Sequence, residues 1–192
     1  MRKYCFVLLI GALFASCTGV SLDKTIFIPD EEDRRLPAYS EWGYNSFGAQ
    51  YERDYFLASR FLFPCKIMYQ GGMLHFSLNG VIRNNVEMSL LFVFPWVQMD
   101  GYRDLVQLNN VLIDLSSDDC TVKILQGDKE TILDIISGEL HFKRAQLLIV
   151  DDIENRAILS GVFDLHFLQN NFPSTISNGR FDVGVDHKVF YQ

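Results

Sequence analysis

Two short motifs, Glu139-x-His141 and Asp164-x-His166, carry the side chains of this chain best suited to metal chemistry. Residues i and i+2 of a β-strand share one face, so each motif would place an imidazole beside a carboxylate. If the two strands paired in register, Glu139, His141, Asp164 and His166 would supply ligands for zinc or another divalent ion. The alternative is the solvent face of a sheet, where polar residues alternate with apolar ones and no ligand is needed.

Other catalytic patterns are missing from the sequence. It has no GxSxG nucleophile elbow, no GxxxxGK[ST] phosphate loop and no GxGxxG dinucleotide motif. The acidic pairs Asp118-Asp119 and Asp151-Asp152 fall in turn-like stretches, where aspartate is favoured for local hydrogen bonds. Cys65 and Cys120 could be separate buried thiols or a disulfide in an oxidising envelope. We therefore expect a protein without enzymatic activity and without a cofactor.

One cysteine has a clear chemical context. Arg2 and Lys3 precede an apolar run, and the stretch Leu13-Phe14-Ala15-Ser16-Cys17 looks like the lipobox of bacterial lipoproteins, with Phe14 where leucine is commonest. Twelve apolar residues rise roughly 18 Å as a helix, which is too short to span a bilayer. We expect residues 1–16 to be a signal peptide and Cys17 to carry the acyl chains of a membrane anchor.

The residue after that cysteine indicates the membrane. An aspartate there usually retains a lipoprotein in the inner membrane, and this chain has Thr18. The pattern favours the outer membrane and leaves the periplasmic and surface faces open.

Aromatic side chains are concentrated in segments whose hydrophobic residues follow neither the helical nor the strand period. Trp42, Tyr44, Trp96 and Tyr102 lie in loop-like stretches, where their rings could stack on a sugar or grip a protein. They could instead plug the open end of a β-structure, or form the mouth of a site for an apolar ligand.

Strand patterns dominate the rest of the chain. Residues 65–69 and 74–78 alternate around Gly71-Gly72, as a hairpin does, and residues 86–94 form a strand that Pro95 ends. Asn79-Gly80 and Asn178-Gly179 predict further turns, and 139–149 and 156–168 a long pair. The sequence therefore predicts an all-β fold, an antiparallel β-sandwich or partly open β-barrel of about 8–10 strands.

The domain boundaries follow from these patterns. Residues 17–38 form a lipidated spacer with little periodicity, and residues 39–192 a single all-β domain, over one edge or end of which the aromatic segment 39–63 is expected to lie. The formal charge of −7 includes two cations of the signal peptide, so the mature chain is more acidic still. Such a charge opposes binding to nucleic acid.

Two segments near the ends of the chain carry a resemblance. Residues 36–49, LPAYSEWGYNSFGA, and the pair SGVFD at 160–164 and ISNGRFDV at 176–183 resemble uncharacterised, all-β lipoproteins of Gram-negative gut bacteria. The resemblance implies a small envelope lipoprotein and implies no activity.

These observations lead to one expected function and two alternatives. The expected function is a non-catalytic, envelope-anchored module that recognises a protein or glycan partner. The first alternative is a small barrel that carries an apolar ligand, because the strands are rich in phenylalanine. The second is a metal-dependent hydrolase built on the Glu139 to His166 patch.

Overall fold

In the part of the chain that the structure describes, twelve strands form one sheet that folds over itself without closing. The computed structural model describes residues 24–150, 153–169 and 171–192. Strands make up 62% of these residues and helices 6%. The predicted all-β fold is confirmed as an open antiparallel structure, with more strands than the 8–10 expected.

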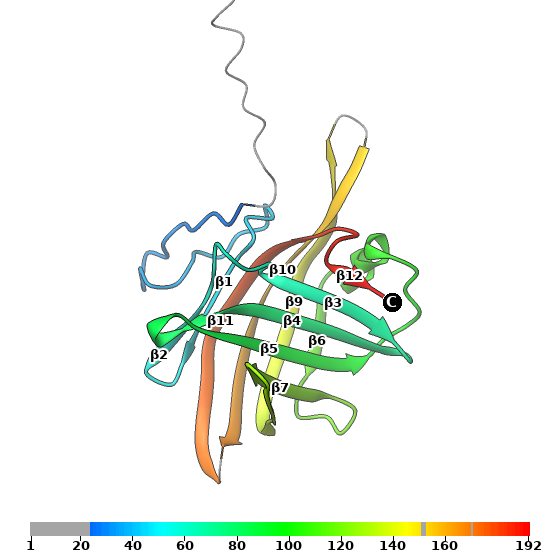
Figure 1. Cartoon of the computed structure of the whole chain (residues 1–192). Coiled ribbons are helices and arrows are strands. Elements are labelled where there is room, and N and C mark those ends of the chain that lie inside the picture. Colours follow the sequence, from blue (N-terminus) through cyan, green and yellow to red (C-terminus); the bar gives the residue numbers. More distant parts are fainter. Residues whose placement is uncertain (1–23, 151–152, 170) are drawn as a thin grey trace, which may run out of the picture.

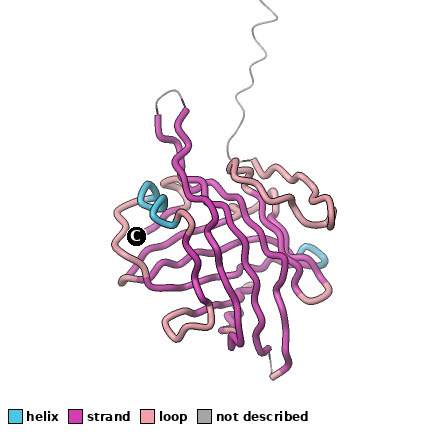
Figure 2. The backbone as a smooth tube through the Cα atoms, turned by 180° about the vertical axis from the view of Figure 1, so that it is seen from behind, coloured by secondary structure: helices cyan, strands magenta, loops and turns pink. Residues whose placement is uncertain are grey.

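The sheet has two halves that face each other. We call the half with strand order β6-β9-β10-β11-β1-β2 the back sheet. Its strands are β6 (Val111–Asp114), β9 (Asp134–Val150), β10 (Ile153–Gln169), β11 (Phe172–Val185), β1 (Ser46–Tyr51) and β2 (Asp54–Ala58). Figure 2 shows these strands from behind, with the β9–β10 hairpin extending beyond the sandwich.

The other half, the front sheet, lies nearest the viewer in Figure 1 and crosses the back sheet. Its strands are β3 (Cys65–Gln70), β4 (Met73–Ile82), β5 (Val86–Pro95), β7 (Thr121–Gln126), β8 (Lys129–Ile132) and β12 (Phe190–Tyr191). Among the described strands, all pairs are antiparallel except β12 with β3, which is parallel. Two rungs between β2 and β4, Leu57 with Val81 and Ala58 with Gly80, join the two sheets.

Phenylalanine rings fill the space between the sheets. Nine of them in the described chain are fully buried: Phe47, Phe56, Phe76, Phe92, Phe94, Phe142, Phe163, Phe167 and Phe181. Phe76 of β4 lies 5.3 Å from Phe142 of β9 and 5.1 Å from Phe181 of β11, measured between ring centroids. The short 3-10 helix η2 (Tyr102–Leu108) adds Leu105 and Leu108 to this core. Rings from both sheets thus form one continuous core.

Of the three turns predicted from glycine-containing dipeptides, one is confirmed and two are wrong. The Gly71-Gly72 hairpin between β3 and β4 is confirmed. Asn79-Gly80 lies inside β4, and Asn178-Gly179 lies inside β11, so both predicted turns are wrong. At Gly179 a Cβ atom would come within 2.5 Å of the carbonyl oxygen and 2.6 Å of the ring of Phe163. Glycine serves close packing there, and Asn178, at φ +54°, accompanies a β-bulge opposite Phe163 and Leu165.

The aromatic segment 39–63 does more than cover an edge. It supplies β1 and β2, which link the two sheets, and its first residues lie over the outer face of the back sheet. The ordered fold also begins before residue 39, because Leu36 is only 1% exposed and packs with Pro37 against the Gly48 backbone. Cys17 and the predicted signal peptide, residues 1–16, lie outside the described residues.

Candidate functional site

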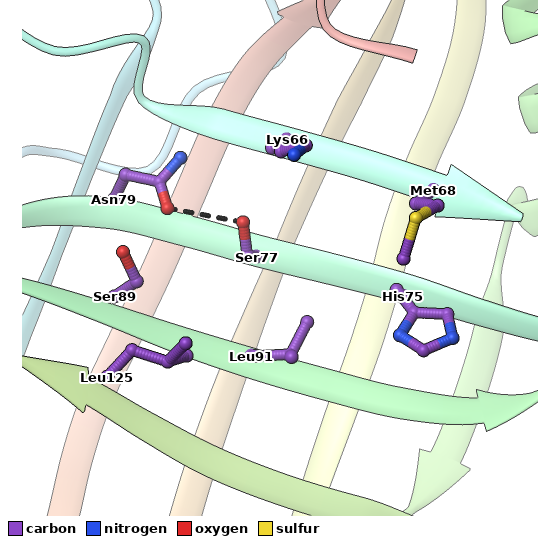
Figure 3. Close-up of a pocket in the computed structure, with 8 residues that line it drawn as sticks. All are labelled: Lys66, Met68, His75, Ser77, Asn79, Ser89, Leu91 and Leu125. Atoms are coloured by element: carbon purple, nitrogen blue, oxygen red, sulfur yellow. Dashed lines mark hydrogen bonds between the residues drawn. The ribbon is translucent and has the colours of Figure 1, made fainter. Parts of the chain in front are cut away.

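The outer face of the front sheet carries a hollow of about 260 Å³, which we call the front hollow. Its lining comes from β3, β4, β5 and β7, and all eight side chains project from the same face (Figure 3). Three rungs that follow one another on this face supply them. In order along β4, they are Met68 and His75; Lys66, Ser77 and Leu91; and Asn79, Ser89 and Leu125.

Small side chains at the centre of this face create the front hollow. Ser77 and Ser89 belong to rungs of β4 and β5 that are neighbours on this face, with one core-facing rung between them. The longer side chains of Lys66, Leu91 and Leu125 stand around them. Ser77 is only 9% exposed although it points away from the core. Two serine hydroxyls thus lie on a polar floor, while most of the surface that lines the front hollow is apolar.

The depression continues beyond the front hollow. An adjoining hollow of about 300 Å³ shares Lys66, Asn79 and Ser89 with it and is bordered by Phe63 and Tyr191. Phe63 and Tyr191 are 61% and 44% exposed, and the Lys66 ammonium lies 4.6 Å from the Tyr191 ring centroid. The polar floor thus ends at an aromatic rim.

Asn79 forms hydrogen bonds both to the floor of the front hollow and to the loop that carries its aromatic rim. Its Oδ1 accepts a hydrogen bond from Ser77 Oγ at 3.2 Å, drawn in Figure 3, and its Nδ2 donates to the carbonyl oxygen of Phe63 at 3.2 Å. Its backbone N–H donates to the carbonyl oxygen of Pro64 at 2.9 Å. The residue that the sequence marked as a turn is therefore a strand residue that positions the aromatic loop.

His75 is the titratable imidazole of the front hollow. Burial, and then the positive charge of Lys123 on β7, lower the pKa of His75 from its ordinary value of 6.5. The ring is therefore mostly neutral at pH 7, so one nitrogen donates a hydrogen bond and the other accepts one. Neutral imidazole, hydroxyl and amide groups match the hydroxyls of a sugar, which also donate and accept.

The four predicted recognition aromatics separate into two pairs. Trp42 and Tyr44 belong to the loop of residues 39–44, which we call the Trp42 loop, and Trp42 is 74% exposed. Trp96 and Tyr102 belong to the connection after β5 and pack against the core. Trp96 stacks edge-on against Phe94, and the Tyr102 hydroxyl lies 3.4 Å from the carbonyl oxygen of Glu154. Of the four residues, Trp42 is the one the structure presents openly to a partner.

The predicted metal patch does not assemble. Asp164 lies opposite Glu139 on β10 and β9, as expected. His141 and His166 each lie two residues from that rung in opposite directions, so they are separated by roughly 13 Å at about 3.3 Å per residue. The Asp164 carboxylate instead accepts a hydrogen bond from the backbone N–H of Asn178 at 2.9 Å. Within the described ranges, no group of three or more His, Cys, Asp or Glu residues could hold a metal ion.

The two cysteines of the described chain are free thiols. Burial raises the pKa of Cys65 to about 12, and burial together with Asp114 and Asp119 raises the pKa of Cys120. A raised pKa keeps a thiol protonated and weakly nucleophilic at pH 7. The sequence left open a disulfide between Cys65 and Cys120 or two separate thiols, and the structure has two separate thiols.

Sequence reasoning missed the front hollow. The sequence pattern placed Ser77 in a strand and Asn79 in a turn, and it gave Ser89 no role, whereas all three belong to β4 and β5. The hollow forms where small polar residues on neighbouring strands align among Lys, Met and Leu side chains. This alignment depends on the strand register, which could not be predicted from the sequence.

Comparison of the chain with protein-family models, with curated proteins and with solved structures gave no match. In the part of the chain that the structure describes, no helix is long and apolar enough to span a membrane. The function is therefore inferred from the geometry of the chain itself and from its N-terminal pattern.

Proposed function

We propose that the mature chain is a lipid-anchored protein of the bacterial cell envelope that binds a glycan or protein partner without transforming it. The observation that carries the binding part is the front hollow, with its polar floor and aromatic rim on an otherwise solvent-exposed sheet. Binding sites combine such apolar surfaces with a few placed polar groups.

The anchoring part is supported by the sequence pattern at the N-terminus. Arg2 and Lys3, an apolar run and Ala15-Ser16-Cys17 match a lipoprotein signal, and Thr18 favours the outer membrane. The resemblance of the two end segments to gut-bacterial lipoproteins points the same way.

A glycan suits the front hollow better than a protein does. The floor offers the Ser89 hydroxyl, the Asn79 amide and a neutral His75 imidazole, and the rim offers the rings of Phe63 and Tyr191. Sugars present hydroxyls in their plane and C–H groups on their faces, which these two sets of groups complement. Stable protein interfaces instead bury roughly 800 Å² per partner.

The two alternative functions have less support. An apolar carrier needs an internal cavity, whereas the phenylalanine rings between the sheets meet at centroid distances of 4.8 to 6.2 Å. A metal-dependent hydrolase on Glu139, His141, Asp164 and His166 needs ligands that the β9–β10 register keeps apart.

The anchor is tested by labelling. We expect radiolabelled palmitate to enter the wild-type chain and a Cys17→Ser variant to lose both the label and its sedimentation with membranes. An unlabelled wild type, or a variant that still sediments as the wild type does, would contradict the anchor.

The binding site is tested with the Cys17→Ser chain on an array of neutral and acidic oligosaccharides. Ser89→Leu fills the front hollow, and we expect it to weaken binding at least about ten-fold, the equivalent of roughly 1.4 kcal/mol. Ser137→Leu, an exposed serine on β9, is the matched control and should bind as the parent does. Equal binding by both variants would exclude the front hollow. Capture of a protein, but no glycan, in a manner sensitive to Ser89→Leu would identify the other partner class.

A further inference from the structure

The Trp42 loop lies on the opposite side of the molecule from the front hollow. Asp182 of β11 points away from the core and accepts hydrogen bonds from the backbone N–H groups of Trp42, Gly43 and Tyr44 at 3.1, 2.7 and 3.2 Å. The hydroxyls of Ser40 and Ser160 also donate to it. The loop is therefore held firmly over the outer face of the back sheet, and Trp42 is presented at 74% exposure.

Aromatic and charged side chains surround Trp42. A hollow of about 470 Å³ is lined by Tyr39, Trp42 and Arg144, and by Glu41, whose carboxylate accepts a hydrogen bond from the Tyr39 hydroxyl at 2.8 Å. The Lys143 ammonium lies 5.1 Å from the Tyr39 ring centroid, so two cations and one carboxylate border this surface. Lys143 and Arg144 are consecutive and both exposed, because the β9–β10 register skips Lys143 between Phe142 and Arg144.

This combination suits a membrane–water interface. Tryptophan and tyrosine rings favour the headgroup layer, where one side of the ring is apolar and the other wet. Lysine and arginine stems extend along apolar surface while their charges reach lipid phosphates.

The described chain begins beside the Trp42 loop. The backbone N–H of Ile26 donates to the carbonyl oxygen of Tyr44 at 2.8 Å. Cys17 is nine residues upstream of Ile26, and nine residues span at most about 30 Å. Ile26, Phe27 and Ile28 on this path are each exposed by more than 40%. An acylated Cys17 would therefore confine the Trp42 loop to the neighbourhood of the bilayer.

We propose that the Trp42 loop contacts the lipid headgroups of the membrane in which Cys17 is anchored, so that the front hollow faces away from the bilayer. The inference depends on the proposed acylation of Cys17. Tethering supplies a high effective concentration, so a modest contact suffices to orient the domain.

Depth-dependent quenching tests this contact. The acylated chain is reconstituted in phosphatidylethanolamine–phosphatidylglycerol vesicles with or without brominated lipids, in a Trp96→Phe background that leaves Trp42 as the single tryptophan. We expect brominated lipid to reduce Trp42 emission roughly two-fold.

The matched control moves the fluorophore to another exposed loop. A chain with Trp42→Phe, Trp96→Phe and Phe61→Trp carries its tryptophan at residue 61, which is 88% exposed and lies two residues before Phe63 of the aromatic rim. Its emission should be unaffected by brominated lipid, and circular dichroism should show that both chains are folded.

Each outcome has a separate meaning. A chain that takes up no palmitate refutes the anchor itself. A palmitoylated, vesicle-bound chain with unquenched Trp42, or with Trp42 and the Phe61→Trp probe quenched equally, overturns the orientation and leaves the anchor standing. A Trp42 emission that responds to soluble oligosaccharide and not to brominated lipid would overturn it in favour of a sugar site.

Discussion

Asp182 shows how one buried carboxylate can organise a surface loop. It is 2% exposed and is surrounded by donors from the Trp42 loop and from Ser160 on the neighbouring strand. A carboxylate offers about four lone-pair positions, so the donors it meets here satisfy it. Gly43, at φ +73°, lets the loop turn its N–H groups toward it.

Replacing Asp182 should release this loop. Asp182→Asn removes the charge and turns one acceptor oxygen into a donor facing other donors, so we expect the free energy of unfolding to fall by about 3 kcal/mol. Urea unfolding followed by circular dichroism measures the change. The control is Asp164→Asn, an exposed carboxylate with a single backbone donor, which should cost less than about 1 kcal/mol. Equal effects of the two variants would refute the special role of Asp182.

The environment of His75 predicts a direction for its titration. Because burial and Lys123 lower its pKa in the folded chain, the unfolded chain binds the proton more tightly. The contribution of His75 to stability is therefore fully present above pH 6.5 and is lost as the pH falls through the lower, folded pKa. An imidazole NMR titration, assigned with His75→Gln, should give a midpoint below 6.5. A midpoint at or above that value would contradict the influence of partial burial and of Lys123 on the ring.

The strands could largely be predicted from the sequence, whereas a turn at Asn79-Gly80 was predicted wrongly. The strands β3, β4 and β5 and the long β9–β10 pair could be predicted, because the alternation of apolar and polar residues is a local property of the sequence. Asn79-Gly80 reads locally as a turn, yet it lies in β4 because Gly80 faces Leu57 and Phe47 from elsewhere in the chain. The front hollow escaped prediction for the same reason, because it depends on how Ser77 and Ser89 align across strands.

The junction of the two sheets should be sensitive to one methyl group. A Cβ atom at residue 80 would come within 2.1 Å of the carbonyl oxygen of Leu57, and only two rungs join β2 to β4 there. We expect Gly80→Ala to lower the free energy of unfolding by about 3 kcal/mol, because backbone must move. Gly101→Ala is the control, since no atom lies within 4 Å of its added methyl and its backbone is extended, and it should change stability by less than about 0.5 kcal/mol.

The whole molecule depends on a core that belongs to neither sheet alone. Phe76 of the front sheet touches Phe142 and Phe181 of the back sheet, and Phe92 of β5 lies 5.5 Å from Phe163 of β10. Neither sheet can keep its phenylalanines out of water without the other. A module of this kind presents rigid outer faces, one with the front hollow and one with the Trp42 loop.

The shared core predicts that both sheets unfold together. Trp42 reports on the loop over the back sheet and Trp96 on the end of the core, so Trp96→Phe and Trp42→Phe chains each follow one region. We expect the two urea transitions, read by fluorescence, to coincide within error, as for other small single domains. Phe76→Leu should lower both midpoints equally, because the lost contacts reach both sheets, at a cost of about 1–2 kcal/mol. Two separate transitions, or a Phe76→Leu effect confined to one probe, would mean that the sheets fold as independent units.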